Sequence, residues 1–170
     1  DPRRQRQMCI RDRFETDLDT FKADAACVVP AQKAGAIAMA AGVNNGDWCP
    51  IVPASMQSQA DENIYVLGDA SIAKSMPKSG FSANSQAKVA ANHIRGALTG
   101  SKVFDARYSN TCWSLVATND GIKVGASYAA GSEAIDVTSK FVSKTGEDSA
   151  LRKATYEESI GWYEGITTDM

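Results

Sequence analysis

The feature that most constrains this chain is a stretch at residues 63–98 that reads, in immediate succession, as one strand, one acidic turn and one long helix. Apolar residues alternate and then run together over residues 63–67, and the turn-forming pair Gly68 and Asp69 follows. We therefore predict a buried strand that ends at a ligand-facing edge. Glycine lets another group approach the backbone closely, and the Asp69 carboxylate can accept hydrogen bonds from ligand hydroxyls.

A long helix is predicted after this turn. Ser79 or Ser82 can serve as its N-cap, and Gly100 is its stop. Apolar residues recur at spacings of three and four, which indicates one buried face: Ala83, Ala87, Ala90, Ala91, Ile94 and Leu98. The first turn presents free N–H groups and a partial positive charge to whatever lies beyond the strand. Alone, the Gly-Asp pair is equally typical of an ordinary βα unit in which Asp69 only caps or turns.

Composition excludes several classes of function. The chain has 170 residues, of which 44% are hydrophobic and 22% charged, and this suits one globular domain or a large part of a bigger protein. No segment approaches the roughly 20 apolar residues of a membrane-spanning helix. The net charge of −2 gives no electrostatic case for nucleic-acid binding. We therefore expect neither a membrane span nor a nucleic-acid partner.

The first 13 residues differ from the rest, since they hold five arginines and two aspartates. This basic segment could be a disordered arm or a targeting remnant, but it lacks the apolar core of a signal peptide. Its run MCIRD, at residues 8–12, resembles the translation of a transposon-derived sequencing adapter. We interpret residues 1–13 as a non-native head, with the native chain entering in mid-protein at Phe14. On that interpretation, the lack of a signal peptide carries no information.

The body combines helical and strand-like segments. We predict a strand at residues 25–29, a short helix at 32–41 and a turn at 44–47 that delivers Trp48-Cys49-Pro50. Residues 112–130 read as a hairpin. The stretch 131–146 is polar and loop-rich with an edge-like segment at 140–143, and 147–166 is helical with these residues on one side: Leu151, Thr155, Ser159, Trp162 and Ile166. The predicted fold class is α/β to α+β.

Several short motifs occur in order along the chain: PAQKAG (30–35), GDWCP (46–50), GDA (68–70), MPKSGFSANSQ (76–86), YSNTC (108–112) and GWY (161–163). Together they resemble the flavoprotein subunit of flavocytochrome c sulfide dehydrogenase, from about Ala23 to the C-terminus. The resemblance implies the C-terminal part of an FAD/NAD(P)-binding flavoprotein with two dinucleotide domains, whose first phosphate loop lies upstream. It divides the chain into the head at 1–13, the closing part of the dinucleotide-binding region at 14–100, and a small α+β flavin-binding and interface domain at 101–170.

The resemblance also implies the site residues. Cys49 would be one cysteine of a redox disulfide beside the flavin, with its partner in the upstream half. The implied cofactor-binding residues are Gly68, Asp69, Lys78, Ser79, Gly80 and Trp162. Lys78 either faces an anionic flavin or polysulfide or is a plain surface lysine. Trp162 either lies near the flavin or plugs the core.

The other cysteines and the single histidine have plainer interpretations. Cys9 falls in the head, Cys27 is expected to be a small buried hydrophobe, and Cys112 is expected to be explained by packing. The spacings give no C-x-x-C pair, so we expect no metal site. His93 lies off the apolar face of its helix and is expected to be solvated and not catalytic.

The implied activity is FAD-dependent oxidation of sulfide to sulfur or polysulfide, with electrons passed to a cytochrome c subunit in the periplasm. The 170-residue chain alone is expected to be inactive. Cys49 should be reduced and reachable from the surface, held between the turn, Trp48 and Pro50. One alternative is a sulfide:quinone or pyridine-nucleotide-disulfide oxidoreductase, although the Trp-Cys-Pro segment fits flavocytochrome better. The other is a non-catalytic docking module.

Overall fold

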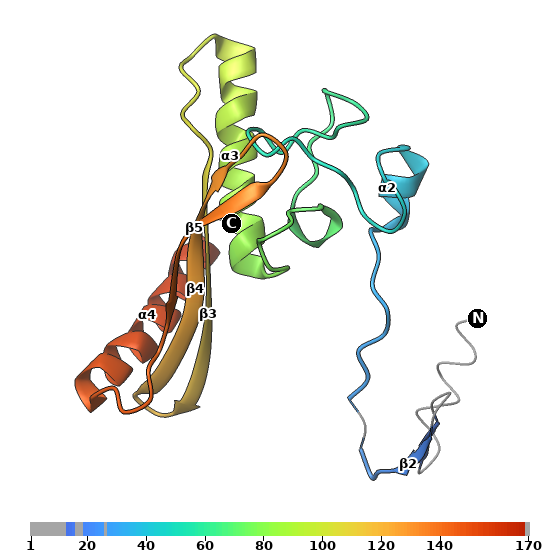
Figure 1. Cartoon of the computed structure of the whole chain (residues 1–170). Coiled ribbons are helices and arrows are strands. Elements are labelled where there is room, and N and C mark those ends of the chain that lie inside the picture. Colours follow the sequence, from blue (N-terminus) through green and yellow to red (C-terminus); the bar gives the residue numbers. More distant parts are fainter. Residues whose placement is uncertain (1–12, 16–18, 26, 169–170) are drawn as a thin grey trace. The chain divides into compact units, whose positions relative to one another are not determined.

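The computed structural model of this chain describes residues 13–15, 19–25 and 27–168 (Figure 1). The chain divides into two compact units, residues 1–32 and 33–170. The described part of the first unit contains an antiparallel pair, β1 (Arg13–Glu15) and β2 (Thr20–Lys22). Residues 1–12, with the adapter-like run and Cys9, lie outside the described residues.

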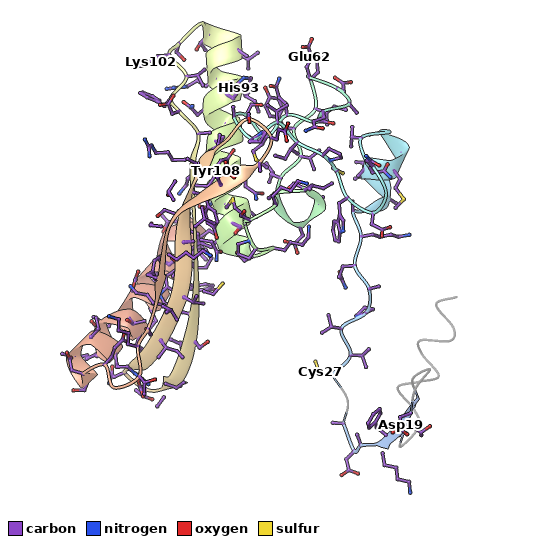
Figure 2. All side chains as sticks on the ribbon, viewed as in Figure 1. Asp19, Cys27, Glu62, His93, Lys102 and Tyr108 are labelled. Carbon is purple, nitrogen blue, oxygen red and sulfur yellow. The ribbon has the colours of Figure 1, made fainter. Side chains whose placement is uncertain are left out.

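The strand predicted at residues 25–29 is wrong. Among the described residues of this segment, none belongs to a strand, and Cys27 is exposed on an extended stretch of chain (Figure 2). The pattern misled because apolar residues make a strand only where a second strand pairs with them. In the part of the chain that the structure describes, residues 27–32 have no such partner and all are exposed. Cys27 is therefore not the buried hydrophobe that was expected.

The second unit opens with the short helix α2 (Ala36–Ala40) and a loop region, residues 43–79. Isolated bridges connect this loop region, including Cys49 with Ser71 and Gln57 with Tyr65. The 3-10 helix η1 (Gly68–Ala70) follows. The strand predicted at 63–67 is wrong, because only one of its residues forms a bridge and no continuous ladder develops.

The long helix α3 (Gly80–Thr99) has the predicted ends. Ser79 is the N-cap, with its Oγ accepting the Ser82 N–H at 3.1 Å, and Gly100 closes the helix in the left-handed conformation. The apolar face was only partly right: Ala90 is buried, but Leu98 is 81% exposed. Two polar residues, Ser82 and Gln86, take part in the buried face in place of expected alanines. The full buried face consists of Ser82, Gln86, Val89, Ala90 and Gly96.

An antiparallel sheet of order β3-β4-β5 follows, formed by β3 (Arg107–Ala117), β4 (Asp120–Ala130) and β5 (Ile135–Val142). The predicted hairpin is confirmed, and Asn119 takes a positive φ in its turn. The prediction of a loop-rich segment at 131–146 with an edge-like piece at 140–143 is only partly right, because β5 begins earlier and pairs with β4 from Ile135 to Val142, with one register shift. With helices packed beside this sheet, the C-terminal region is a small α+β domain (Figure 1).

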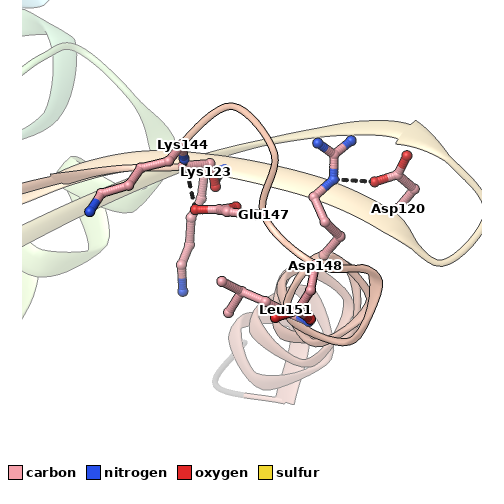
Figure 3. A network of polar contacts seen from close by, with 8 residues as sticks. Asp120, Lys123, Lys144, Glu147, Asp148 and Leu151 are labelled. Atoms are coloured by element: carbon pink, nitrogen blue, oxygen red, sulfur yellow. Dashed lines mark hydrogen bonds and ion pairs between the residues drawn. The ribbon is translucent and has the colours of Figure 1, made fainter.

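The C-terminal helix α4 (Ser149–Thr168) packs against β4 and β3. Arg152 pairs with Asp120 at the start of β4 (Figure 3), and Lys123 pairs with Glu158. The Asp148 carboxylate accepts the Leu151 N–H at 2.9 Å and so caps the first turn. No helix in the described residues is both long and apolar enough to cross a membrane.

Two apolar clusters form the core of the second unit. The larger one lies between α3, the sheet and the loop region, and consists of Ile51, Met56, Ala73, Met76, Val89, Ala90, Ala106, Tyr108, Ala126, Tyr128 and Ile135. The smaller one joins α2 to the loop region and consists of Ala34, Ala38, Val43 and Cys49. Tyr108 connects the sheet to the loop region by donating its hydroxyl hydrogen bond to the Pro53 carbonyl.

Candidate functional site

Cys49 sits on a short extended segment beside η1. Its N–H donates to the Ala70 carbonyl at 2.9 Å, and its carbonyl accepts the Ile72 N–H at 2.8 Å. The thiol is free but fully buried in the smaller cluster, against Ala34, Ala38 and Val43. The expectation that it is reachable from the surface is therefore wrong for this structure. It nevertheless lies beside the turn that holds Asp69.

The turn at Gly68–Ala70 requires its glycine. Gly68 has φ +69°, a conformation that side chains with a Cβ rarely adopt, and its N–H donates to the Gln86 Oε1 of α3 at 2.7 Å. The Gly68 carbonyl accepts both the N–H and the hydroxyl of Ser71. The Asp69 side chain is exposed, and within the described part of the chain its carboxylate accepts no hydrogen bond. A rigid turn thus presents an open carboxylate.

Lys78 connects three parts of this region. Its ammonium donates to the backbone carbonyl of Asp69 and to that of Ser71, the latter at 3.2 Å. It also lies 3.6 Å from the centroid of the Trp48 ring, as in a cation–π contact. Burial lowers the pKa of Lys78, while the negative charges of Asp69 and of an ionised Cys49 oppose that shift. Burial raises the pKa of the Cys49 thiol, and the positive charge of Lys78 opposes that rise.

The start of α3 adjoins this turn. Ser79 Oγ donates to Asn110 Oδ1 at 2.5 Å, and Ser82 Oγ donates to the same atom at 3.1 Å, so β3 fixes the first turn of the helix. The first N–H groups of a helix have no intrahelical acceptors. Next to them lies a cavity of about 200 Å³ whose lining includes Trp48, Gly68, Lys78, Ser79 and Gln86. Five of the predicted cofactor-binding residues thus lie within one short stretch of turn and helix start.

Trp162, the sixth, reaches the same end of α3 through aromatic contacts. Its ring stacks on Phe81, the second residue of α3, with centroids 5.4 Å apart and planes at 16°. Trp113 of β3 lies 5.7 Å from Trp162 and 5.8 Å from Phe81. The Trp113 Nε1 is buried and has no hydrogen-bond partner among the described residues. Sequence reasoning missed Phe81 and Trp113, although both lie in or beside the quoted motifs.

Two other predictions need correction. Cys112 is exposed and not packed, although strand alternation places it on the same face of β3 as the buried Tyr108 and Asn110. His93 is half-buried and not simply solvated, since its Nδ1 lies 2.8 Å from the hydroxyl of Tyr65 (labelled His93 in Figure 2). His93 lies in the second half of α3, away from the helix start, and Tyr65 lies in the loop region.

Comparison with known families identifies the C-terminal region. Residues 104–170 match the family described as flavocytochrome c sulphide dehydrogenase, flavin-binding. The match spans the sheet, α4 and Trp162, together with the YSNTC and GWY motifs. The motifs before residue 104, including those of Cys49 and Asp69, lie outside it. Over residues 104–170 the chain is therefore similar to the flavin-binding family of flavocytochrome c sulphide dehydrogenase, the family that the motifs indicated.

Proposed function

We propose that this chain is the C-terminal part of a flavin-dependent sulfide dehydrogenase, which oxidises sulfide to sulfur or polysulfide and passes electrons through FAD to a cytochrome c subunit in the periplasm. The observation that carries the proposal is the meeting of three features at one place: the Cys49 segment, the Gly68–Ala70 turn and the start of α3. The family match of the adjoining domain supports it.

The residues present fit a flavin in three respects. The open Asp69 carboxylate suits the hydroxyls of a ribityl chain, and the first turn of α3 suits a ring system that gains negative charge. The buried Trp113 Nε1 offers a donor without a partner among the described residues. Lys78, Ser79 and Gly80 form the helix start, and Trp162 stacks on Phe81 beside it. When bound, FAD would supply the acceptance of two electrons and their onward transfer.

Cys49 is the proposed redox cysteine, paired as a disulfide with a cysteine of an upstream half. Sulfide, as HS⁻, attacks one sulfur of that disulfide; the S–S bond breaks, a persulfide forms on one cysteine, and the other leaves as a thiolate that holds the bonding pair. In this structure the Cys49 sulfur is covered by Ala34, Ala38 and Val43. Exchange with sulfide therefore requires the α2 segment to move or the upstream half to reorder it.

The proposal keeps the domain division predicted above. Residues 14–100 would complete a dinucleotide-binding region, 101–170 would form the flavin-binding and interface domain, and 1–13 would be a non-native head. Without the first phosphate loop and the partner of Cys49, the 170-residue chain should not turn over sulfide. Sulfide-dependent cytochrome reduction by this chain alone would contradict that expectation.

The flavin contact is tested by Asp69→Ala in the complete flavoprotein. If Asp69 accepts a hydrogen bond from a ribityl hydroxyl, the variant should bind flavin more weakly by about 1–3 kcal/mol. The measurement is flavin retention, followed by visible absorbance during dialysis. Asp105→Ala, which removes an exposed carboxylate near the start of β3, is the matched control. Unchanged retention in Asp69→Ala would refute the contact.

A further inference from the structure

Lys78 and Cys49 hold the same piece of backbone. The Ala70 carbonyl accepts the Cys49 N–H, while the carbonyls on either side of it, those of Asp69 and Ser71, both accept from the Lys78 ammonium. These three carbonyls follow one another at the end of η1 and directly after it. The segment of residues 69–71 is therefore held by two separate groups, the Cys49 backbone and the Lys78 side chain.

Trp48 closes this arrangement. Its ring lies under the Lys78 ammonium at 3.6 Å from the centroid, and it precedes Cys49 directly in the chain. The lysine head thus contacts both the residue before the thiol and the turn beside it. Lys78 is exposed as a residue, yet its ammonium folds back onto two carbonyls and a ring. Its three contacts account for the choice of conformation.

The charged groups around the thiol are few. From the turn comes Asp69, and from the segment before α3 comes Lys78. The α2 side of the smaller cluster contributes only Ala34, Ala38 and Val43. Burial raises the pKa of the Cys49 thiol, and among the charged groups of the described residues Lys78 is the one that lowers it.

We propose that Lys78 is a positioning residue that ties the Trp48–Cys49 segment to the Gly68–Ala70 turn and holds its positive charge against that segment. The role of Lys78 in catalysis rests on the proposed function, since a redox cysteine acts as the thiolate. The contacts of Lys78 and the ionisation of the Cys49 thiol can be measured in this chain without any assay of sulfide oxidation.

The test is the ionisation of Cys49, measured by NMR of the cysteine ¹³Cβ during a pH titration of the 170-residue chain. Lys78→Met removes charge and donors, Lys78→Gln keeps a donor without charge, and Lys78→Arg keeps both. We expect the first two to raise the Cys49 pKa by about one unit, and the arginine variant to leave it close to that of the parent chain. Lys88→Met, which removes an exposed lysine of α3, should not change it.

A Cys49 pKa that is unchanged in Lys78→Gln would overturn the inference, as would an equal shift in Lys88→Met. If Lys78→Met fails to fold, the glutamine and arginine variants still decide the question. The proposed function fails separately: if Cys49→Ser retained sulfide oxidation in the complete flavoprotein while Lys78 still set the thiol pKa, the catalytic assignment would be wrong and the positioning role would stand.

Discussion

Residues 43–79 and residues 107–168 are held together in different ways. The sheet consists of two long antiparallel ladders, in which each neighbouring pair of strands shares many backbone hydrogen bonds, and α4 packs against it. The loop region has only isolated bridges, and single side chains such as Lys78 and Gln86 hold its turns. One region therefore derives its shape from repetition and the other from a few specific contacts. The proposed redox and ribityl contacts lie in the second kind of structure, where one substitution can move a functional atom.

The largest effect is expected where α4 lies closest to the sheet. A Cβ at Gly121 would lie 2.9 Å from the Tyr156 backbone nitrogen, so Gly121→Ala must push the whole helix away. We expect a loss of about 2–3 kcal/mol in the free energy of unfolding, measured by urea denaturation. Gly161→Ala is the control, since a Cβ there meets nothing within 4 Å. Because alanine favours a helix more than glycine does, Gly161→Ala should leave the free energy of unfolding unchanged or raise it. Equal stability of Gly121→Ala and the parent would show that α4 packs loosely.

A smaller effect is expected in the loop region, from backbone strain and not from crowding. At Gly68 a Cβ would make only an ordinary contact with Ala83, at 3.5 Å, but φ is +69°. Gly68→Ala should cost about 1–2 kcal/mol of unfolding free energy. Gly80→Ala, in a helical conformation with open space around it, should change little. If both variants unfold at the same urea concentration as the parent, the turn is not the fixed point that we describe.

The smallest effect concerns the contact that joins the two regions. Tyr108→Phe removes the hydroxyl that donates to the Pro53 carbonyl, at a cost of about 1 kcal/mol near neutral pH. Burial raises the pKa of Tyr108 above its ordinary value of about 10. The stability that the Tyr108 hydroxyl contributes is therefore fully present below pH of about 10. It is lost as the pH rises from there toward the folded-state pKa, because the tyrosine ionises more readily in the unfolded chain than in the folded one.

In Tyr108→Phe this alkaline loss should be shallower than in the parent. The measurement is the free energy of unfolding between neutral pH and pH of about 11. Tyr163→Phe, at an exposed tyrosine of α4, serves as the control. Parallel pH curves for Tyr108→Phe and the parent would contradict the burial argument.

Sequence predicted the regular region better than the loop region, for physical reasons. Periodicity and cap residues located α3, α4 and the hairpin, because these elements depend on local pattern and on ends such as Ser79 and Gly100. The strand at 63–67 was wrong because strand formation depends on a partner that the local sequence does not encode. Only the end of β5 was predicted, as the edge-like segment at 140–143, since its exposed, polar first half resembles a loop.

The site was predictable as motifs but not as geometry. The motifs marked Cys49, Asp69 and Lys78, yet no local pattern indicates that Lys78 folds back onto the turn or that α2 covers the thiol. Trp162 was predicted, but its ring neighbours Phe81 and Trp113 were missed, because the three rings come from three separate elements. Such contacts depend on tertiary packing and not on sequence spacing.

The central claim is that Cys49 carries the electrons of sulfide oxidation, and the most direct measurement is sulfide-dependent flavin reduction in the complete flavoprotein carrying Cys49→Ser. Cys27→Ser, at an exposed cysteine of the first unit, is the matched control and should behave as the parent. We predict that Cys49→Ser abolishes reduction by sulfide while dithionite still reduces the bound flavin. Near-normal sulfide-dependent reduction in Cys49→Ser would contradict the account.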